Sequence, residues 1–125
     1  MSLILIYNMD GGREAKLKML CRKFFIDTRT VEKSEYGLSL GCLLGTREEA
    51  QPRTGEDFDD EMLYISELPG GMLNLFLSQL RRNKLIIPLK AIRTETNEGF
   101  TSYELYSELC AEREAISKGS AAHKQ

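Results

Sequence analysis

Histidine and tryptophan are almost absent from this chain: its 125 residues include one histidine, His123, and no tryptophan. Hydrolytic triads, histidine general bases and histidine-ligated metal sites all need a histidine inside the folded domain. His123 instead lies in residues 118–125, a tail without large apolar residues that we expect to be disordered. The sequence thus argues against most hydrolases, and we expect no catalytic residue, no metal site and no cofactor.

Cysteine is also scarce, with Cys21, Cys42 and Cys110 forming an odd set that has no C-x-x-C spacing. This usage fits reduced, buried thiols better than a disulfide framework or a zinc site. The longest early apolar run, Leu3–Tyr7, is too short for a signal-peptide core or a membrane span. We therefore expect a cytoplasmic protein with no membrane association.

Nucleotide-binding loops of the P-loop and G-x-G-x-x-G types are missing, and Gly11-Gly12 alone is a weak phosphate signal. Asp10 would repel phosphate there, so we expect it to cap a helix. The net charge of -2 provides no strong field for nucleic acid. Arg22-Lys23 and the run 81–84 fit helix C-termini, where cations are favoured, better than a nucleic-acid surface.

What the chain does contain is a soluble domain's composition, 42% hydrophobic and 29% charged, with alternating strand and helix patterns. Strands are expected at Leu3–Tyr7, Ile26–Glu32, Met62–Ile65 and Leu85–Ile92. Helices are expected over Arg13–Phe24, Glu35–Leu44 (or a loop, given Gly37, Gly41 and the following Gly45), Pro69–Lys84 and Thr101–Ser117. Pro88 places the last strand at a sheet edge or a bulge.

The order of these elements predicts an α/β fold made of two βαβα halves that share a four-stranded sheet with flanking helices. The halves, 1–45 and 61–117, form one domain and are joined by an acidic linker, 46–60. Similar Gly-Gly pairs and basic helix ends indicate an internal repeat. A ferredoxin-like split βαβ arrangement of α+β type is the alternative.

The last helix carries the clearest local signal, a capping box formed by Thr101 and Glu104, with Phe100 and Leu105 spaced as a hydrophobic staple. Its inward face should include Leu105, Tyr106, Leu109, Cys110 and Ile116. Acidic pairs also occur, at Asp59-Asp60-Glu61 and at Glu112 with Glu114, and we interpret both as solvated.

Polar residues gather where the fourth strand stops, in a pattern typical of ligand sites at strand ends. The candidate ligand-binding residues are Lys90, Thr94, Thr96 and Asn97, joined by Asn8 and Ser66 if the sheet is parallel. Lys90 would neutralise a phosphate-containing or other anionic ligand. The competing interpretation is an edge-strand lysine that deters sheet pairing, followed by ordinary loop residues.

The function that these observations favour is a non-catalytic ligand-binding or protein-interaction module. Met72 and Leu75 lie off the apolar stripe of their helix, so a homodimer through that surface is one hypothesis. A small enzyme or sensor that binds an anionic ligand through Lys90 is the alternative.

The segment Ile87-Pro88-Leu89-Lys90-Ala91-Ile92, followed by Thr94-x-Thr96-Asn97 and a Leu-rich acidic helix, resembles a bacterial family known as domain of unknown function 3783. Ile6–Met9 and the stretch 36–41 are similar to the amino-terminal part of the same proteins. Glu95 stands where members often have proline. The resemblance implies a bacterial cytoplasmic protein and supplies no catalytic residues.

Overall fold

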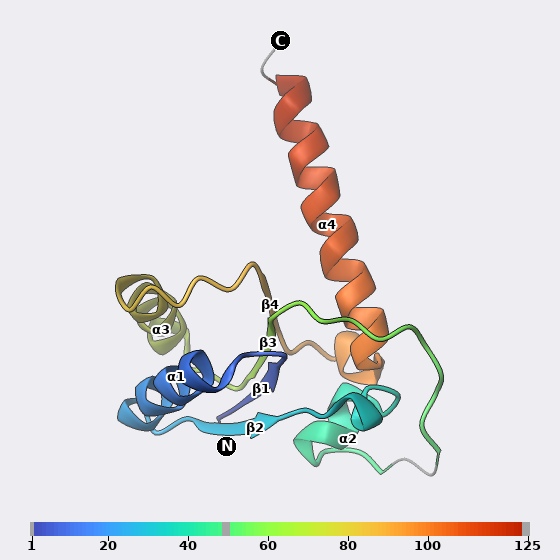
Figure 1. Ribbon diagram of the computed structural model, residues 1–125, viewed down its shortest axis with the longest axis horizontal. Helices are drawn as coiled ribbons and strands as arrows, with labels where there is room; N and C mark the ends of the chain where they lie inside the picture. The colour runs from blue at the N-terminus through green and yellow to red at the C-terminus, as the bar shows by residue number, and fades with distance from the viewer. Residues whose placement is uncertain (1, 49–50, 124–125) are drawn as a thin grey trace.

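The structure is a computed structural model that describes residues 2–48 and 51–123. A four-stranded sheet in the order β2-β1-β3-β4 has helices on both faces (Figure 1). The strands are β1 (Leu3–Tyr7), β2 (Asp27–Thr30), β3 (Met62–Ser66) and β4 (Leu89–Ile92). The helices are α1 (Gly11–Lys23), α2 (Leu40–Leu44), α3 (Gly70–Arg82) and α4 (Ser102–His123), with short 3-10 turns at Lys33–Glu35 and Asn97–Gly99. The predicted α/β class is confirmed.

The two central strands run antiparallel, with Leu5 opposite Tyr64, while β1 pairs with β2 and β3 pairs with β4 in parallel. Each half is therefore a parallel βαβ unit, and the two units are joined through the antiparallel pair β1 and β3. Because helices cover both faces, nearly every residue of β1 and β3 is buried, which explains their uninterrupted apolar sequences.

Two hydrophobic cores lie on opposite faces of this sheet. The first packs α1 and α3 against the sheet through Ile4, Ile6, Leu17, Leu20, Cys21, Ile26, Leu63, Ile65, Phe76, Leu80, Leu85 and Ile87. The second packs α2 and α4 against the other face through Leu5, Tyr7, Val31, Tyr36, Leu40, Leu43, Phe58, Met62, Tyr64, Leu89 and Leu105. Alternate side chains of each strand divide between these cores, as the strand period requires.

The two halves share unusual backbone geometry at matching places. Asn8 and Glu67, each the third residue before a helix, have φ of 59° and 56°. Phe25 and Lys84, each the second residue after a helix, have φ of 56° and 58°. Left-handed geometry is uncommon outside glycine, so both helices enter and leave the sheet by the same local path.

The predicted helix over Glu35–Leu44 is only partly present, because α2 begins at Leu40. Gly37 explains the break: a Cβ there would stand 2.1 Å from the backbone oxygen of Arg53. The glycine thus allows two backbones to approach closely, and the Arg53 amide donates to the Gly37 carbonyl at 2.8 Å.

Both predicted helix caps are confirmed. The Arg13 amide donates to Asp10 Oδ1 at 3.0 Å, and Thr101 and Glu104 exchange the two hydrogen bonds of a capping box at 3.0 and 3.1 Å. Pro88 immediately precedes β4, which is an edge strand as expected, although β4 starts only at Leu89.

The far end of α4 differs from the prediction, because the helix continues past Ser117 to His123 instead of giving way to a tail at 118 (Figure 1). Ile116, expected on the inward face, is 69% exposed because α4 leaves the sheet before that point.

The segment predicted as a solvated linker is instead attached to the domain, and its one buried side chain among residues 51–60 is a phenylalanine ring. Phe58 is 4% exposed and stacks between Tyr36 and Tyr106, with ring centroids 4.7 and 4.1 Å away. One aromatic residue among many acids carries no periodic signal, so the sequence analysis missed this anchor.

Removing that ring should destabilise the whole domain. We expect Phe58→Ala to lower the free energy of unfolding by about 3 kcal/mol, because a buried aromatic side chain is lost. Urea denaturation followed by circular dichroism measures the change. The exposed Thr54→Ala is the control and should change stability by less than about 0.5 kcal/mol. Equal effects of the two variants would contradict the anchoring role.

Candidate functional site

Asn8 lies at the opposite end of the sheet from the other polar residues that were predicted to share one rim. Since β1 and β3 are antiparallel, the end of β1 at Asn8 lies beside the start of β3, whereas Ser66 ends β3 beside the start of β1. The parallel sheet on which the shared rim depended is therefore absent, and Asn8 does not join Lys90, Thr94, Thr96 or Asn97.

Asn8 and Asn97 use their amide groups within the protein. Asn8 Nδ2 donates to the carbonyls of Phe58 and Asp60 at 3.0 and 3.1 Å, and its Oδ1 accepts from Tyr36. Asn97 Oδ1 accepts from the Tyr64 hydroxyl at 2.5 Å and from the Thr94 amide at 2.8 Å. These contacts hold loops against the second core, which is the ordinary use of asparagine in turns.

Ser66 and the turn that contains Thr94, Thr96 and Asn97 lie at the same end of the sheet, because β3 and β4 are parallel. Thr96 is exposed, Ser66 is buried, and the Lys90 ammonium donates to the Ile87 carbonyl. Lys90 lies on an edge strand, as the competing interpretation expected. Its pKa is lowered by burial and, secondarily, by the charge of Arg81.

Glu98 is a buried carboxylate that the sequence analysis missed. Arg93 donates to its Oε2 from Nε at 2.9 Å and from Nη2 at 2.5 Å, and Thr46 donates to Oε1. The Thr46 hydrogen bond, followed by Arg93, lowers the pKa of Glu98 against the opposing effect of burial. This network joins the segment after α2 to the turn before α4, so its role is structural.

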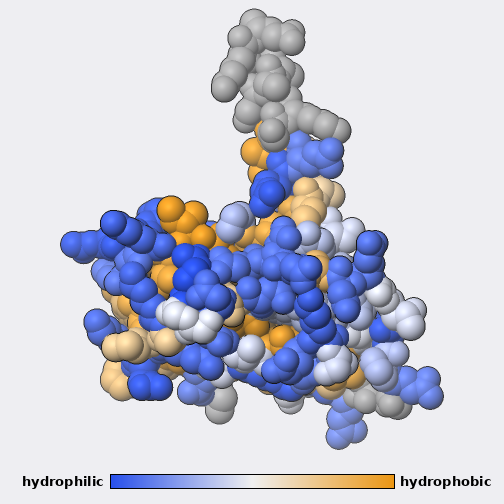
Figure 2. Space-filling view, viewed as in Figure 1, coloured by the Kyte–Doolittle hydropathy of each residue, from blue (hydrophilic) through white to orange (hydrophobic). Residues whose placement is uncertain are grey.

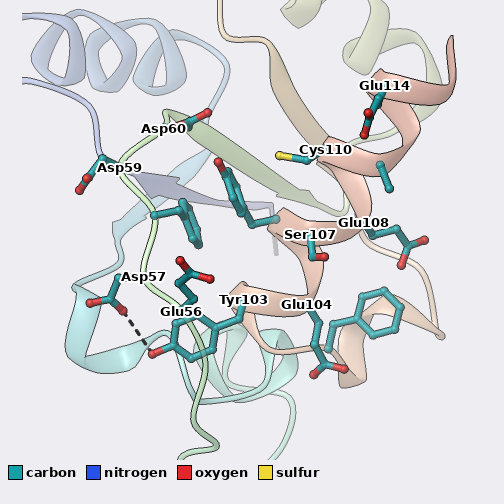
Figure 3. Close-up of a pocket in the computed structure, with 14 residues that line it drawn as sticks. Glu56, Asp57, Asp59, Asp60, Tyr103, Glu104, Ser107, Glu108, Cys110 and Glu114 are labelled. Atoms are coloured by element: carbon teal, nitrogen blue, oxygen red, sulfur yellow. Dashed lines mark hydrogen bonds between the residues drawn. The ribbon is translucent and has the colours of Figure 1, made fainter. Parts of the chain in front are cut away.

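A cleft with a volume of about 1110 Å³ lies elsewhere, between residues 56–60 and α4. Figure 3 shows Asp57, Asp59 and Asp60 along the extended segment and Tyr103, Ser107 and Cys110 along the helix. We call this the acidic cleft. The 56–60 wall is held in place by Phe58, and the other wall is held by the capped start of α4.

All seven charged residues that line the acidic cleft are acidic: Glu56, Asp57, Asp59, Asp60, Glu104, Glu108 and Glu114. Outside the lining, Lys33 contacts Asp59, and Arg53 Nη1 lies 3.2 Å from Glu104. The charged lining of the cleft is acidic throughout, which attracts positively charged ligands.

Aromatic side chains form the floor between these acids. Phe58 and Tyr106 are stacked with an interplanar angle of 2°, and Phe100 and Tyr103 complete the aromatic lining. Tyr103 donates to Asp57 Oδ1 at 3.3 Å, and a Cβ on Gly55 would collide with its ring. Half-buried tyrosine faces beside carboxylates suit cations with apolar stems.

Local surroundings raise the pKa of both tyrosines in the cleft. The pKa of Tyr106 is raised to about 12, first by its hydrogen bond with Cys110, then by burial and by neighbouring negative groups including Asp60. Burial raises the pKa of Tyr103, and the Asp57 charge adds to it. Both phenols therefore stay neutral hydrogen-bonding groups at physiological pH.

The cysteines are less uniformly buried than predicted. Cys21 is buried, and burial raises its pKa to about 12, so its thiolate is not available near neutral pH. Cys42 and Cys110 are half-buried, and Cys110 lines the acidic cleft. Among the described residues, no group of His, Cys, Asp and Glu is arranged to hold a metal ion. Within residues 2–48 and 51–123, no helix combines the length and the apolarity that a membrane span needs.

Comparison with known proteins identifies the second half of the chain. The family model of domain of unknown function 3783 matches residues 61–116, which run from β3 into α4. The predicted resemblance is confirmed for this segment, which contains Lys90, Asn97 and the α4 wall of the acidic cleft. No curated protein and no solved structure matches the chain.

The Glu98 network should make the free energy of unfolding depend on pH. Its folded-state pKa lies below the ordinary value of 4.5, so its contribution is present above that value and is lost as pH falls through the folded pKa. We expect Glu98→Gln to lower the free energy of unfolding at pH 7 by roughly 2 kcal/mol, since it removes charge-assisted hydrogen bonds.

Chemical denaturation at neutral pH and at about pH 3.5 measures both effects. The difference in free energy of unfolding between Glu98→Gln and the unmodified protein should be smaller at acid pH. Glu95→Gln, which changes an exposed carboxylate in the same loop, is the matched control and should leave stability nearly unchanged. A gap that is independent of pH would contradict the role assigned to the Glu98 charge.

Proposed function

We propose that the protein is a non-catalytic interaction module that binds a lysine- and arginine-rich segment of a partner protein in the acidic cleft. The observation that carries this proposal is the cleft itself, about 1110 Å³ in volume, with an aromatic floor and only acidic residues among its charged lining. An aromatic surface bordered by carboxylates offers the two features that long cationic side chains use, an apolar path and a charged end point.

The shape of the cleft favours an extended segment over a small ion. Its carboxylates follow two separate elements, the 56–60 segment and more than two turns of α4 from Glu104 to Glu114. Successive basic side chains of a peptide would meet them one after another. A single metal ion would need several carboxylates to converge within about 2.6 Å of one point.

The charge at the cleft also favours rapid, salt-sensitive association. Electrostatic complementarity raises association rates and selects partners more than it adds affinity, and it weakens as salt screens the charges. The protein would therefore recognise a class of basic segments, with aromatic contacts adding affinity.

Several narrower proposals accompany this function. The matched left-handed residues before and after α1 and α3 support an internal repeat of the two halves. The segment that resembles domain of unknown function 3783 supports a bacterial, cytoplasmic protein. Leu75 is 50% exposed on α3 and Met72 is half-buried nearby in sequence, which supports a homodimer through this helix.

A fluorescein-labelled peptide of alternating arginine, lysine and glycine tests the proposed function. Anisotropy titration at about 50 mM salt should show saturable binding that weakens strongly at about 500 mM salt. The double variant Asp60→Asn with Glu108→Gln should weaken binding by roughly threefold to tenfold, because it removes two cleft charges.

The matched control is Asp27→Asn with Glu95→Gln, which removes one aspartate and one glutamate from exposed positions outside the cleft. It should retain the affinity of the unmodified protein. Equal losses in the two double variants would show attraction by net charge alone and would contradict a cleft site, as would the absence of binding at low salt. Tighter binding of calcium or magnesium than of the peptide would indicate a cation site instead.

The homodimer proposal is tested by sedimentation velocity at high micromolar concentration. We expect a dimer, and we expect Leu75→Glu to shift it to monomer because the change places a charge in an apolar contact. The control is Asn74→Glu, which adds the same charge at the adjacent exposed position. A protein that stays monomeric at this concentration would contradict the proposal.

A further inference from the structure

A second cavity lies on the other side of the sheet from the acidic cleft, where α3 ends beside the edge strand β4. Its volume is about 340 Å³, and it is lined by Leu77, Leu80, Arg81, Leu85, Ile86 and Lys90. Leu80 and Leu85 belong to the core of α1 and α3, whereas Ile86 is 70% exposed. Figure 2 shows hydrophobic residues at the surface over α3 and the segment that follows it.

The lining is apolar except for two cations. Four of its six residues are aliphatic, and the two others are Arg81 and Lys90. Both residues are exposed overall, and within the described residues neither cation has a carboxylate within ion-pairing distance. The cavity therefore combines an apolar surface with positive charge that the protein leaves uncompensated.

The ammonium group of Lys90 is held at this cavity by its hydrogen bond to the Ile87 carbonyl. Burial and the nearby Arg81 charge both lower the pKa of Lys90. An anion near both side chains would offset the repulsion between Lys90 and Arg81. It would also accept charge-assisted hydrogen bonds from both.

We propose that this cavity binds a small amphipathic carboxylate, with its aliphatic tail against Leu77, Leu80 and Leu85 and its carboxylate at Arg81 and Lys90. A volume of about 340 Å³ is within the range of small-molecule sites and suits a chain of medium length. The site is independent of the proposed function, because it shares no lining residue with the acidic cleft.

Octanoate is the probe for this site. Titration of isotope-labelled protein, followed by NMR shifts of leucine and isoleucine methyl groups, should show saturable changes at Leu80, Leu85 and Ile86. Octanol, which lacks the charge, acetate, which lacks the tail, and octylamine, which reverses the charge, should each bind at least tenfold more weakly.

The variants Arg81→Gln and Lys90→Gln should each weaken octanoate binding by roughly tenfold, the loss of one charge-assisted hydrogen bond. Arg82→Gln and Lys84→Gln are matched controls, because they remove the same charges from exposed residues outside the cavity. Ile86→Ser should also weaken binding, and its exposed position avoids a folding defect. Binding of octanol equal to that of octanoate would overturn the role of the cations. Equal losses in all four charge variants, or shifts confined to α4, would overturn the site itself.

Discussion

The antiparallel pairing of β1 with β3 is the constraint on which the rest of the structure depends. It places Leu5 opposite Tyr64 in the middle of the sheet and joins two parallel βαβ units that run in opposite directions. Each unit sends its first helix to the same face of the sheet, so α1 and α3 build one core and α2 and α4 build the other. The same pairing places the carboxyl ends of the strands of the two halves at opposite ends of the sheet. This separates Asn8 from the polar turn around Asn97.

This arrangement also separates charge. The face formed by α1 and α3 carries basic residues in the last turn of both helices, where the negative end of the helix dipole stabilises them. The opposite face carries the acidic cleft, because the connection between the halves crosses there and is held by Phe58 against Tyr36 and Tyr106. A chain with a net charge of only -2 thus presents two surfaces of opposite sign, and the two proposed sites differ in ligand for that reason.

Local signals in the sequence were sufficient for much of the fold. Asp10, the Thr101 capping box and Pro88 each act within a few residues of their own position, and each behaves as predicted. The relative direction of β1 and β3 was not predictable in this way, because the acidic connection between the halves is long enough for either direction. Ile116 was misassigned because a helix that leaves the domain keeps its local pattern after it has lost its partner.

The candidate site was less accessible to sequence analysis than the fold. Phe58 and Glu98 lie in polar segments where one buried residue produces no periodicity, yet one anchors the cleft wall and the other joins two loops. Carboxylates such as Asp60 and Glu114 were interpreted as solvated, and both are exposed. That they line one cleft follows from the close approach of α4 to the 56–60 segment, which is a tertiary feature (Figure 3).

The measurement that tests the account most directly is a map of backbone amide shifts in isotope-labelled protein as a short arginine- and lysine-rich peptide is added. The account predicts that the shifts concentrate in residues 56–60 and along α4 from Tyr103 to Glu114, with the α1 and α3 face unchanged. Shifts spread evenly over exposed acids, or concentrated on α1 and α3, would contradict the acidic cleft as the binding site.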